Sequence, residues 1–181
     1  ETILNDMLLL ARLEDAGTEL KREAVDAATL IEGAGEVCQA RAEAAHVNLR
    51  REVPQGLVFQ GHRHLLEQAL VNLIDNAIKY GGANKLVTVT ATRHNQTVLL
   101  TVRDQGPGID TAQAARVFER FYRIDSGRSR EQGGSGLGLA VVKHVVRVHQ
   151  GTVSVKNLPE GGCAFTLALP LEMGVALPGC A

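Results

Sequence analysis

Four polar residues recur at helical spacing in the stretch NLIDNAIKY, residues 72–80: Asn72, Asn76, Lys79 and Tyr80. Offsets of three and four residues place them on one face of a helix. Amide oxygens are neutral, hard ligands for a magnesium ion that already carries phosphate oxygens, and an ammonium group can contact those phosphates. A solvated helix face is the simpler interpretation of this stretch taken alone, so the rest of the chain must decide.

A second block, DQGPG, begins at Asp104 directly after a predicted strand. A carboxylate at a strand end has a fixed position, and Gly106 and Gly108 let another molecule approach the backbone closely. An ordinary Asp-Gly turn is the competing interpretation. The chain contains no G-x-x-x-x-G-K-[ST] sequence, and neither glycine block completes G-x-G-x-x-G, which argues against P-loop and Rossmann sites.

The third block, GGSGLGL, covers residues 133–139 and runs into a predicted helix at residues 137–149. Glycines that lead into a helix expose free amide groups at the positive end of the helix dipole, where an anion such as phosphate can bind. A flexible hinge before the helix is the alternative.

Between the glycine blocks, residues 116–130 hold five arginines and only two acidic residues. These arginines could reach a triphosphate or could be solvated, and the sequence does not decide between the two. Phe118 and Phe121, three residues apart, are predicted to seat this segment on the core.

The elements that must position these blocks follow from hydrophobic periodicity. We predict helices at residues 25–45, 65–80, 113–118 and 137–149, and strands at residues 47–53, 57–59, 86–92, 98–102, 152–156 and 164–169. Strands that are neighbours in sequence are expected to form hairpins, which gives a mixed, mostly antiparallel sheet. The predicted fold class is α+β, a two-layer sandwich with helices on one face of the sheet.

Composition narrows the possible functions. The chain has 181 residues, a formal net charge of -1, four Phe, two Tyr and no Trp, which argues against nucleic-acid binding. Its three cysteines, Cys38, Cys163 and Cys180, form no C-x-x-C pair, so neither a zinc site nor a disulfide framework is indicated, and a reducing cytoplasm fits best. No apolar run reaches the length of a membrane span, and no signal peptide is evident.

In combination, the blocks resemble the catalytic and ATP-binding domain of bacterial sensor histidine kinases, which share the Bergerat-type nucleotide fold with gyrase and MutL. NLIDNAIKY, DQGPG, VFERFYRID and GGSGLGL occur in the order of that family. The resemblance is strong over residues 57–170 and weaker back to residue 20. It divides the chain into a remnant of the dimerisation and phosphoacceptor helix at residues 1–16, the catalytic domain at residues 17–172 and a tail at residues 173–181.

The resemblance implies a role for each block. Asn76, helped by Asn72, would bind magnesium, Lys79 would contact phosphate and Tyr80 would pack on the adenine. Asp104 would accept a hydrogen bond from the adenine amino group. The remaining nucleotide-binding positions implied in this way are Gly106 and Gly108 at the adenine, Gly134, Gly136, Leu137 and Gly138 at the phosphates, and Arg123 at the γ-phosphate. Arg128 and Arg130 match no fixed position of the family.

One position bears on the type of reaction. In the ATP-hydrolysing relatives a Glu stands four residues before the magnesium-binding Asn and activates water, whereas this chain has Asn72, which cannot act as a base at neutral pH. The neighbouring Asp75 is predicted to point off that face. We therefore expect phosphoryl transfer to a protein side chain; an ATP-hydrolysing clamp and a non-catalytic nucleotide sensor are the alternatives.

The phosphoacceptor of the family is a His followed by an acidic residue, and none of the six histidines has such a neighbour. We interpret all six as structural or surface residues. The resemblance thus implies an ATP- and magnesium-dependent kinase domain whose partners are a helical hairpin of the same protein and a response regulator. The parent protein would be homodimeric and anchored in the bacterial inner membrane, with this domain in the cytoplasm.

Overall fold

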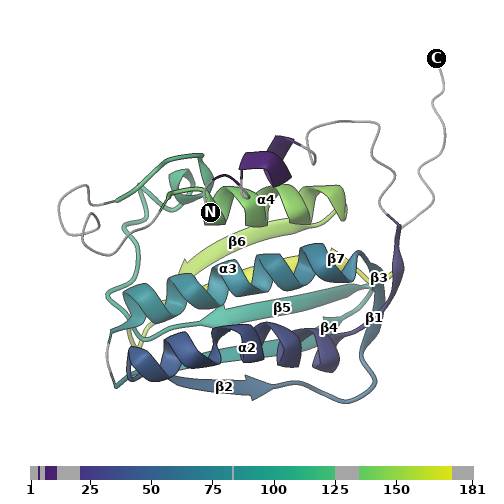
Figure 1. Cartoon of the computed structure of the whole chain (residues 1–181), viewed down its shortest axis with the longest axis horizontal. Coiled ribbons are helices and arrows are strands. Elements are labelled where there is room, and N and C mark those ends of the chain that lie inside the picture. Colours follow the sequence, from purple (N-terminus) through teal and green to yellow (C-terminus); the bar gives the residue numbers. More distant parts are fainter. Residues whose placement is uncertain (1–3, 5–6, 12–20, 83, 125–134, 173–181) are drawn as a thin grey trace.

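A five-stranded sheet forms one layer of the protein and three helices form the other. The computed structural model describes residues 4, 7–11, 21–82, 84–124 and 135–172. The order of strands in the sheet is β2-β4-β5-β7-β6, and α2, α3 and α4 lie side by side on one face of it (Figure 1). This arrangement confirms the α+β sandwich predicted from the sequence.

The helices and strands have the following bounds. In chain order they are β1 Glu23–Asp26, α2 Ala27–Ala44, β2 Asn48–Glu52, β3 Val58–Gly61, α3 Arg63–Gly81, β4 Leu86–His94, β5 Thr97–Arg103, the short 3-10 helix η1 Arg116–Phe118, α4 Gly138–Val148, β6 Thr152–Asn157 and β7 Cys163–Pro170. Residues 7–11 are also helical, as the N-terminal prediction required. The remainder of that prediction, and the tail at residues 173–181, lie outside the described residues.

Two predictions about the strands were wrong. β2 and β3 do not form a hairpin, because β2 pairs in parallel with β4 while β3 pairs antiparallel with β1 in a separate two-stranded sheet. Residues 25 and 26, predicted as the start of a helix, instead belong to the strand β1. The helix begins only at Ala27 because the Asp26 carboxylate accepts a hydrogen bond from the Thr29 amide at 2.8 Å and so caps it.

The core lies between the sheet and the leucine stripe of α3. Residues on β7 alternate between buried and half-buried, as expected for a strand with one face on a core. From α3, Leu66, Leu70 and Leu73 are fully buried against this layer. Each such leucine contributes roughly 1.5–3 kcal/mol by leaving water, so α3 is firmly fixed and its polar face is held in place.

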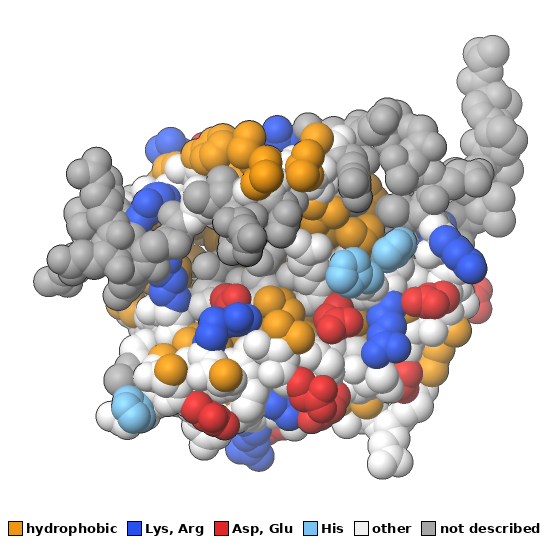
Figure 2. All heavy atoms as spheres, in the orientation of Figure 1, with side chains coloured by type: hydrophobic (Ala, Val, Ile, Leu, Met, Phe, Trp, Pro, Cys, Tyr) orange, Lys and Arg blue, Asp and Glu red, His pale blue; other side chains and the backbone are white. Residues whose placement is uncertain are grey.

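The outer face of the helical layer carries mixed charge. Figure 2 shows acidic and basic side chains interspersed over α2 and α3, so neither sign dominates this part of the surface. Hydrophobic side chains gather along the upper edge of the same view. Leu4, Met7 and Leu8 are among the exposed large hydrophobic residues. In the part of the chain that the structure describes, no helix is both long and apolar enough to cross a membrane.

Candidate active site

The polar face of α3 lies next to the start of α4. The side-chain amide of Asn72 donates a hydrogen bond from Nδ2 to the Gly138 carbonyl at 3.3 Å, which joins the first block to the third. Asn76 is half-buried, and its side chain makes no hydrogen bond within the described residues. Asp75 instead forms an ion pair with Arg41 of α2 at 2.7 Å, so it points away from the asparagines as predicted.

Asp104 directly follows β5 and is a buried carboxylate with only 5% of its surface exposed. Its Oδ1 accepts hydrogen bonds from the Gly106 amide at 2.8 Å and the Cys163 amide at 3.3 Å. Its Oδ2 accepts one from the Cys163 thiol at 3.0 Å. Sequence reasoning missed Cys163, because this residue follows Asp104 by 59 positions and contacts it only through the β5–β7 pairing.

The first glycine block is pressed against the end of α3. A Cβ atom at Gly106 would lie 2.6 Å from the Tyr80 carbonyl oxygen, so only glycine fits there without a shift of the backbone. The Tyr80 side chain itself is 49% exposed, and the Lys79 ammonium lies 5.4 Å from the centre of its ring. Asp104 and Tyr80, predicted on separate blocks, are thus brought to one place.

The second glycine block packs on the segment that follows η1. Gly136 has a φ of 71°, and its carbonyl accepts a hydrogen bond from the Phe121 amide at 2.9 Å. The Leu137 side chain is buried in the core, so only its backbone could contact a ligand. α4 begins at Gly138 with Leu137 as its N-cap residue, and among the described residues no side chain caps the amide groups of its first turn. Gly134, Arg128 and Arg130 lie outside the described residues.

The two phenylalanines of the intervening block differ in role. Phe118 is buried and meets Phe165 of β7 edge to face, with ring centroids 6.1 Å apart. Phe121 is 60% exposed and has a φ of 61°. The prediction that both residues seat the segment on the core was therefore wrong for Phe121, because its backbone follows the tight contact with Gly136.

Two positive groups interact at this end of α3. Burial, and to a smaller degree the Arg123 guanidinium, lower the pKa of Lys79. The Nε and Nη2 atoms of Arg123 are buried and have no hydrogen-bond partner in the described part of the chain. Two neighbouring cations with unused donors are unfavourable alone and favourable around an anion, so this region is suited to a phosphate chain.

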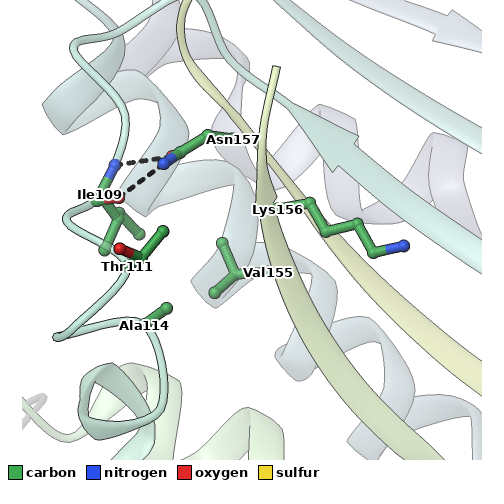
Figure 3. Close-up of a pocket in the computed structure, with 6 residues that line it drawn as sticks. All are labelled: Ile109, Thr111, Ala114, Val155, Lys156 and Asn157. Carbon is green, nitrogen blue, oxygen red and sulfur yellow. Dashed lines mark hydrogen bonds between the residues drawn. The ribbon is translucent and has the colours of Figure 1, made fainter. Parts of the chain in front are cut away.

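A separate cavity of about 420 Å³ lies beside the first glycine block (Figure 3). It lies between the loop that contains Ile109, Thr111 and Ala114 and the end of β6. Asn157 of β6 holds Ile109 by two hydrogen bonds, while the Lys156 side chain points away from the loop. None of the residues predicted for the nucleotide site lines this cavity.

Comparison with known proteins places this arrangement in a family. A family model described as histidine kinase-, DNA gyrase B-, and HSP90-like ATPase matches residues 61–173. The sensor-like histidine kinase SenX3 of Mycobacterium tuberculosis is 41% identical over 165 residues, which cover 91% of this chain and 40% of SenX3.

Solved structures of sensor kinases agree. The mycobacterial sensor histidine kinase MprB is similar with a TM-score of 0.73 and 31% identity, covering 83% of this chain and 97% of that chain. Full-length ShkA in complex with AMPPNP has a TM-score of 0.82 and 30% identity, covering 97% of this chain and 36% of ShkA.

The chain belongs to the family of histidine kinase-, DNA gyrase B- and HSP90-like ATPases. Within that family its relatives are sensor histidine kinases, and the chain is the catalytic ATP-binding domain of such a kinase. It spans 40% of the length of SenX3.

Proposed function

We propose that this domain binds Mg-ATP across α3, the first glycine block and the start of α4, and donates the γ-phosphoryl group to a histidine on a separate helical hairpin. The observation that carries the proposal is the pair of interacting cations Lys79 and Arg123, of which Arg123 has two buried nitrogens with no partner among the described residues. The buried Asp104 carboxylate packs on the end of the same helix, where a Cβ at Gly81 would lie 3.5 Å from the Asp104 Cβ. An acceptor for a base and donors for phosphates, on adjacent elements, match the two ends of a nucleotide.

The base end is built around Asp104. Its carboxylate would accept a hydrogen bond from the exocyclic amino group of adenine, which distinguishes adenine from bases that carry an oxygen at that position. Gly106 and Gly108 carry no side chain, so the base could approach the neighbouring backbone closely. The exposed ring of Tyr80 would cover the base, since a flat aromatic surface stacks well on a purine.

The phosphate end combines Lys79, Arg123 and the first turn of α4. The Arg123 nitrogens that have no partner among the described residues would donate hydrogen bonds to a terminal phosphate, while the Lys79 ammonium would act as a point charge. Gly136 and Gly138 keep side chains away from the backbone amides that would meet the inner phosphates. Gly134 and the backbone of Leu137 complete this part of the proposal.

Magnesium would be held by amide oxygens. In the described part of the chain there is no group of three or more His, Cys, Asp or Glu residues that could hold a metal alone. The side-chain amide of Asn76 makes no hydrogen bond among the described residues. The Asn72 side chain donates from its nitrogen to the Gly138 carbonyl, which leaves its oxygen free to act as a ligand. Such neutral ligands suit an ion that arrives with phosphate oxygens, and the ion would neutralise charge on those phosphates.

Asn72 also supports transfer over hydrolysis. A residue that activates water must accept a proton, and an amide cannot do so at neutral pH. Here the amide is in addition tied to Gly138. Positioning and charge stabilisation supply most of the catalysis in phosphoryl transfer, so no protein base is required in this domain.

Several features of the parent protein belong to the same proposal. Residues 1–16, with exposed Leu4, Met7 and Leu8, would be the end of the hairpin helix, residues 17–172 the catalytic domain and residues 173–181 a tail. The parent would be a homodimer anchored in the inner membrane, with this domain in the cytoplasm. The phosphoryl group on its hairpin would then pass to the receiver domain of a response regulator.

The test is a transfer experiment. The 181-residue chain is mixed with ATP labelled in the γ-phosphate, magnesium and an intact phosphoacceptor hairpin. We expect acid-labile phosphohistidine on the hairpin and none on the chain itself. Release of inorganic phosphate with an unlabelled hairpin would instead support the hydrolysing clamp, and ATP binding without either product would support a nucleotide sensor.

A further inference from the structure

The end of the β6–β7 hairpin holds the first glycine block at both of its ends. Cys163 contacts Asp104 at the start of the block, and Asn157 contacts Ile109 directly after it. Asn157 and Cys163 are themselves cross-strand partners in the β6–β7 pairing. One short piece of hairpin therefore touches both sides of the loop.

Three hydrogen bonds tie Cys163 to Asp104. The Asp104 amide donates to the Cys163 carbonyl at 3.0 Å, the Cys163 amide donates to Oδ1 at 3.3 Å, and the thiol donates to Oδ2 at 3.0 Å. Burial, with the neighbouring Asp104, raises the pKa of the Cys163 thiol, so it stays protonated and remains a donor. Each carboxylate oxygen has roughly two lone-pair sites, so Oδ2 keeps one for a ligand.

The other end of the loop is held by a side-chain amide. The Ile109 amide donates to Oδ1 of Asn157 at 2.8 Å, and Nδ2 of Asn157 donates to the Ile109 carbonyl at 2.7 Å (Figure 3). A Cβ at Gly108, which has a φ of 81°, would lie 2.8 Å from the same Oδ1. The loop therefore fits the hairpin only in one conformation.

The hairpin turn brings the two contacts together. Gly162 has a φ of 82°, and a Cβ there would overlap the Asp104 carbonyl oxygen. The Leu158 amide donates to the Gly162 carbonyl and the Gly161 amide to the Leu158 carbonyl, both at 3.0 Å. This tight turn lets Cys163 reach the carboxylate while Asn157 reaches Ile109.

We infer that Cys163 and Asn157 are positioning residues for base recognition: Cys163 orients the Asp104 carboxylate toward the adenine amino group, and Asn157 fixes the loop on which it sits. The inference rests on the proposed role of Asp104. Neither residue touches the nucleotide in this account. They would hold the loop in its binding conformation before ATP arrives, so that no free energy is lost in ordering the loop when ATP binds.

The test separates the base from the phosphates. ATP and inorganic tripolyphosphate, which lacks a base, are titrated calorimetrically into the 181-residue protein and its variants. We expect Cys163→Ala and Asn157→Ala each to raise the Kd for ATP about three- to tenfold, the scale of one modest hydrogen bond, and to leave tripolyphosphate unchanged. Cys163→Ser, which keeps a donor, should recover most of the ATP affinity.

Matched controls are present in the chain. Cys38→Ala removes another fully buried thiol, in α2, and Lys156→Ala changes the neighbour of Asn157 whose side chain points away from the loop. Both should bind ATP like the wild type. Asn157 is exposed, so its variant keeps the test possible even if Cys163→Ala does not fold.

The outcomes distinguish this inference from the proposed function. If Asp104→Asn loses ATP affinity while Cys163→Ala and Asn157→Ala do not, the inference is overturned and the function stands. An equal loss of ATP and tripolyphosphate affinity in these variants, in step with a lower melting temperature, also overturns it, because that is the signature of a purely structural role. Unchanged ATP affinity in Asp104→Asn overturns the role of Asp104 on which the inference rests, whereas failure of the proposed function shows as absence of phosphoryl transfer to the hairpin.

Discussion

The two ends of the proposed nucleotide site are built in opposite ways. At the base end, the Asp104 carboxylate already accepts three hydrogen bonds from Gly106 and Cys163. At the phosphate end, the charge of Arg123 disfavours the charged form of Lys79, and two buried Arg123 nitrogens have no partner among the described residues. The protein satisfies its own groups at the first end and leaves charge unsatisfied at the second.

This difference assigns separate tasks to the two ends. A carboxylate held by neighbouring donors keeps one geometry, which selects a base by shape and hydrogen bonding. Two cations that repel each other gain most from an anion between them, so in this proposal most of the binding energy is expected from the phosphates. Three changes should act on these ends unequally, and a fourth should act on the scaffold alone.

The largest effect is expected at the turn that holds the base end. Gly162→Ala places a methyl group against the Asp104 carbonyl oxygen in a backbone conformation that disfavours side chains. We expect it to destabilise the fold by about 3 kcal/mol, a sum of steric and backbone strain. Thermal unfolding measures this. Gly56→Ala, with a φ of 73° and open space around it, isolates the backbone cost and should lose only about 1 kcal/mol.

Arg123→Ala should act on the phosphate end alone. Loss of charged hydrogen bonds to the γ-phosphate is expected to weaken ATP binding by about 1.5–3 kcal/mol and ADP binding much less. Calorimetric titrations with both nucleotides measure the difference. Arg93→Ala, an exposed arginine on the β4–β5 hairpin, is the control. Equal losses for ATP and ADP would place Arg123 away from the terminal phosphate.

Lys79→Met should have effects of opposite sign on stability and binding. Burial and Arg123 both disfavour the charged form of Lys79 in the free protein, so its removal should leave the melting temperature unchanged or slightly higher. ATP binding should weaken by about 1 kcal/mol, because one phosphate contact is lost. A lower melting temperature with intact ATP affinity would assign Lys79 to the scaffold.

The smallest effect is a pH dependence of the scaffold. Burial lowers the pKa of His149 below its ordinary value of 6.5, and its Nε2 accepts a hydrogen bond from the His62 amide at 2.9 Å. The unfolded chain therefore takes up a proton first as the pH falls. Stability is complete above about pH 6.5 and is lost below it, by at most about 1.4 kcal/mol per pH unit, until the lowered folded pKa is reached.

Denaturant unfolding between pH 7.5 and 5 tests this. His149→Gln should flatten the decline below pH 6.5, whereas the exposed His94→Gln should not. The same slope in the wild type and His149→Gln would remove His149 as its source. Since His149 lies away from both ends of the site, loss of ATP binding in acid should follow unfolding.

Much of the fold was predictable because local pattern and tertiary structure agree. The leucine stripe of α3 and the paired glycines after Tyr80 mark a helix that the structure places at Arg63–Gly81. The β4–β5 and β6–β7 hairpins follow from alternation around short turns. In these elements each residue's environment is set by neighbours a few positions away.

The errors arose where distant residues decide the outcome. β2 pairs in parallel with β4 across the whole of α3, and no local pattern specifies that partner. Phe121 looked like a core residue by spacing, yet the contact with Gly136 turns its backbone and exposes the ring. Cys163 and Asn157 lay between the strands predicted at residues 152–156 and 164–169, and only the register of β5, β7 and β6 brings them to the first glycine block.

The division of labour between the two ends is tested most directly by one pair of titrations on Asp104→Asn. The substitution keeps the shape of the side chain but removes a negative acceptor. The affinity for ATP should fall by about 1.5–3 kcal/mol, and the affinity for inorganic tripolyphosphate should equal that of the wild type. An unchanged ATP affinity, or an equal loss for both ligands, would contradict the assignment of Asp104 to the base.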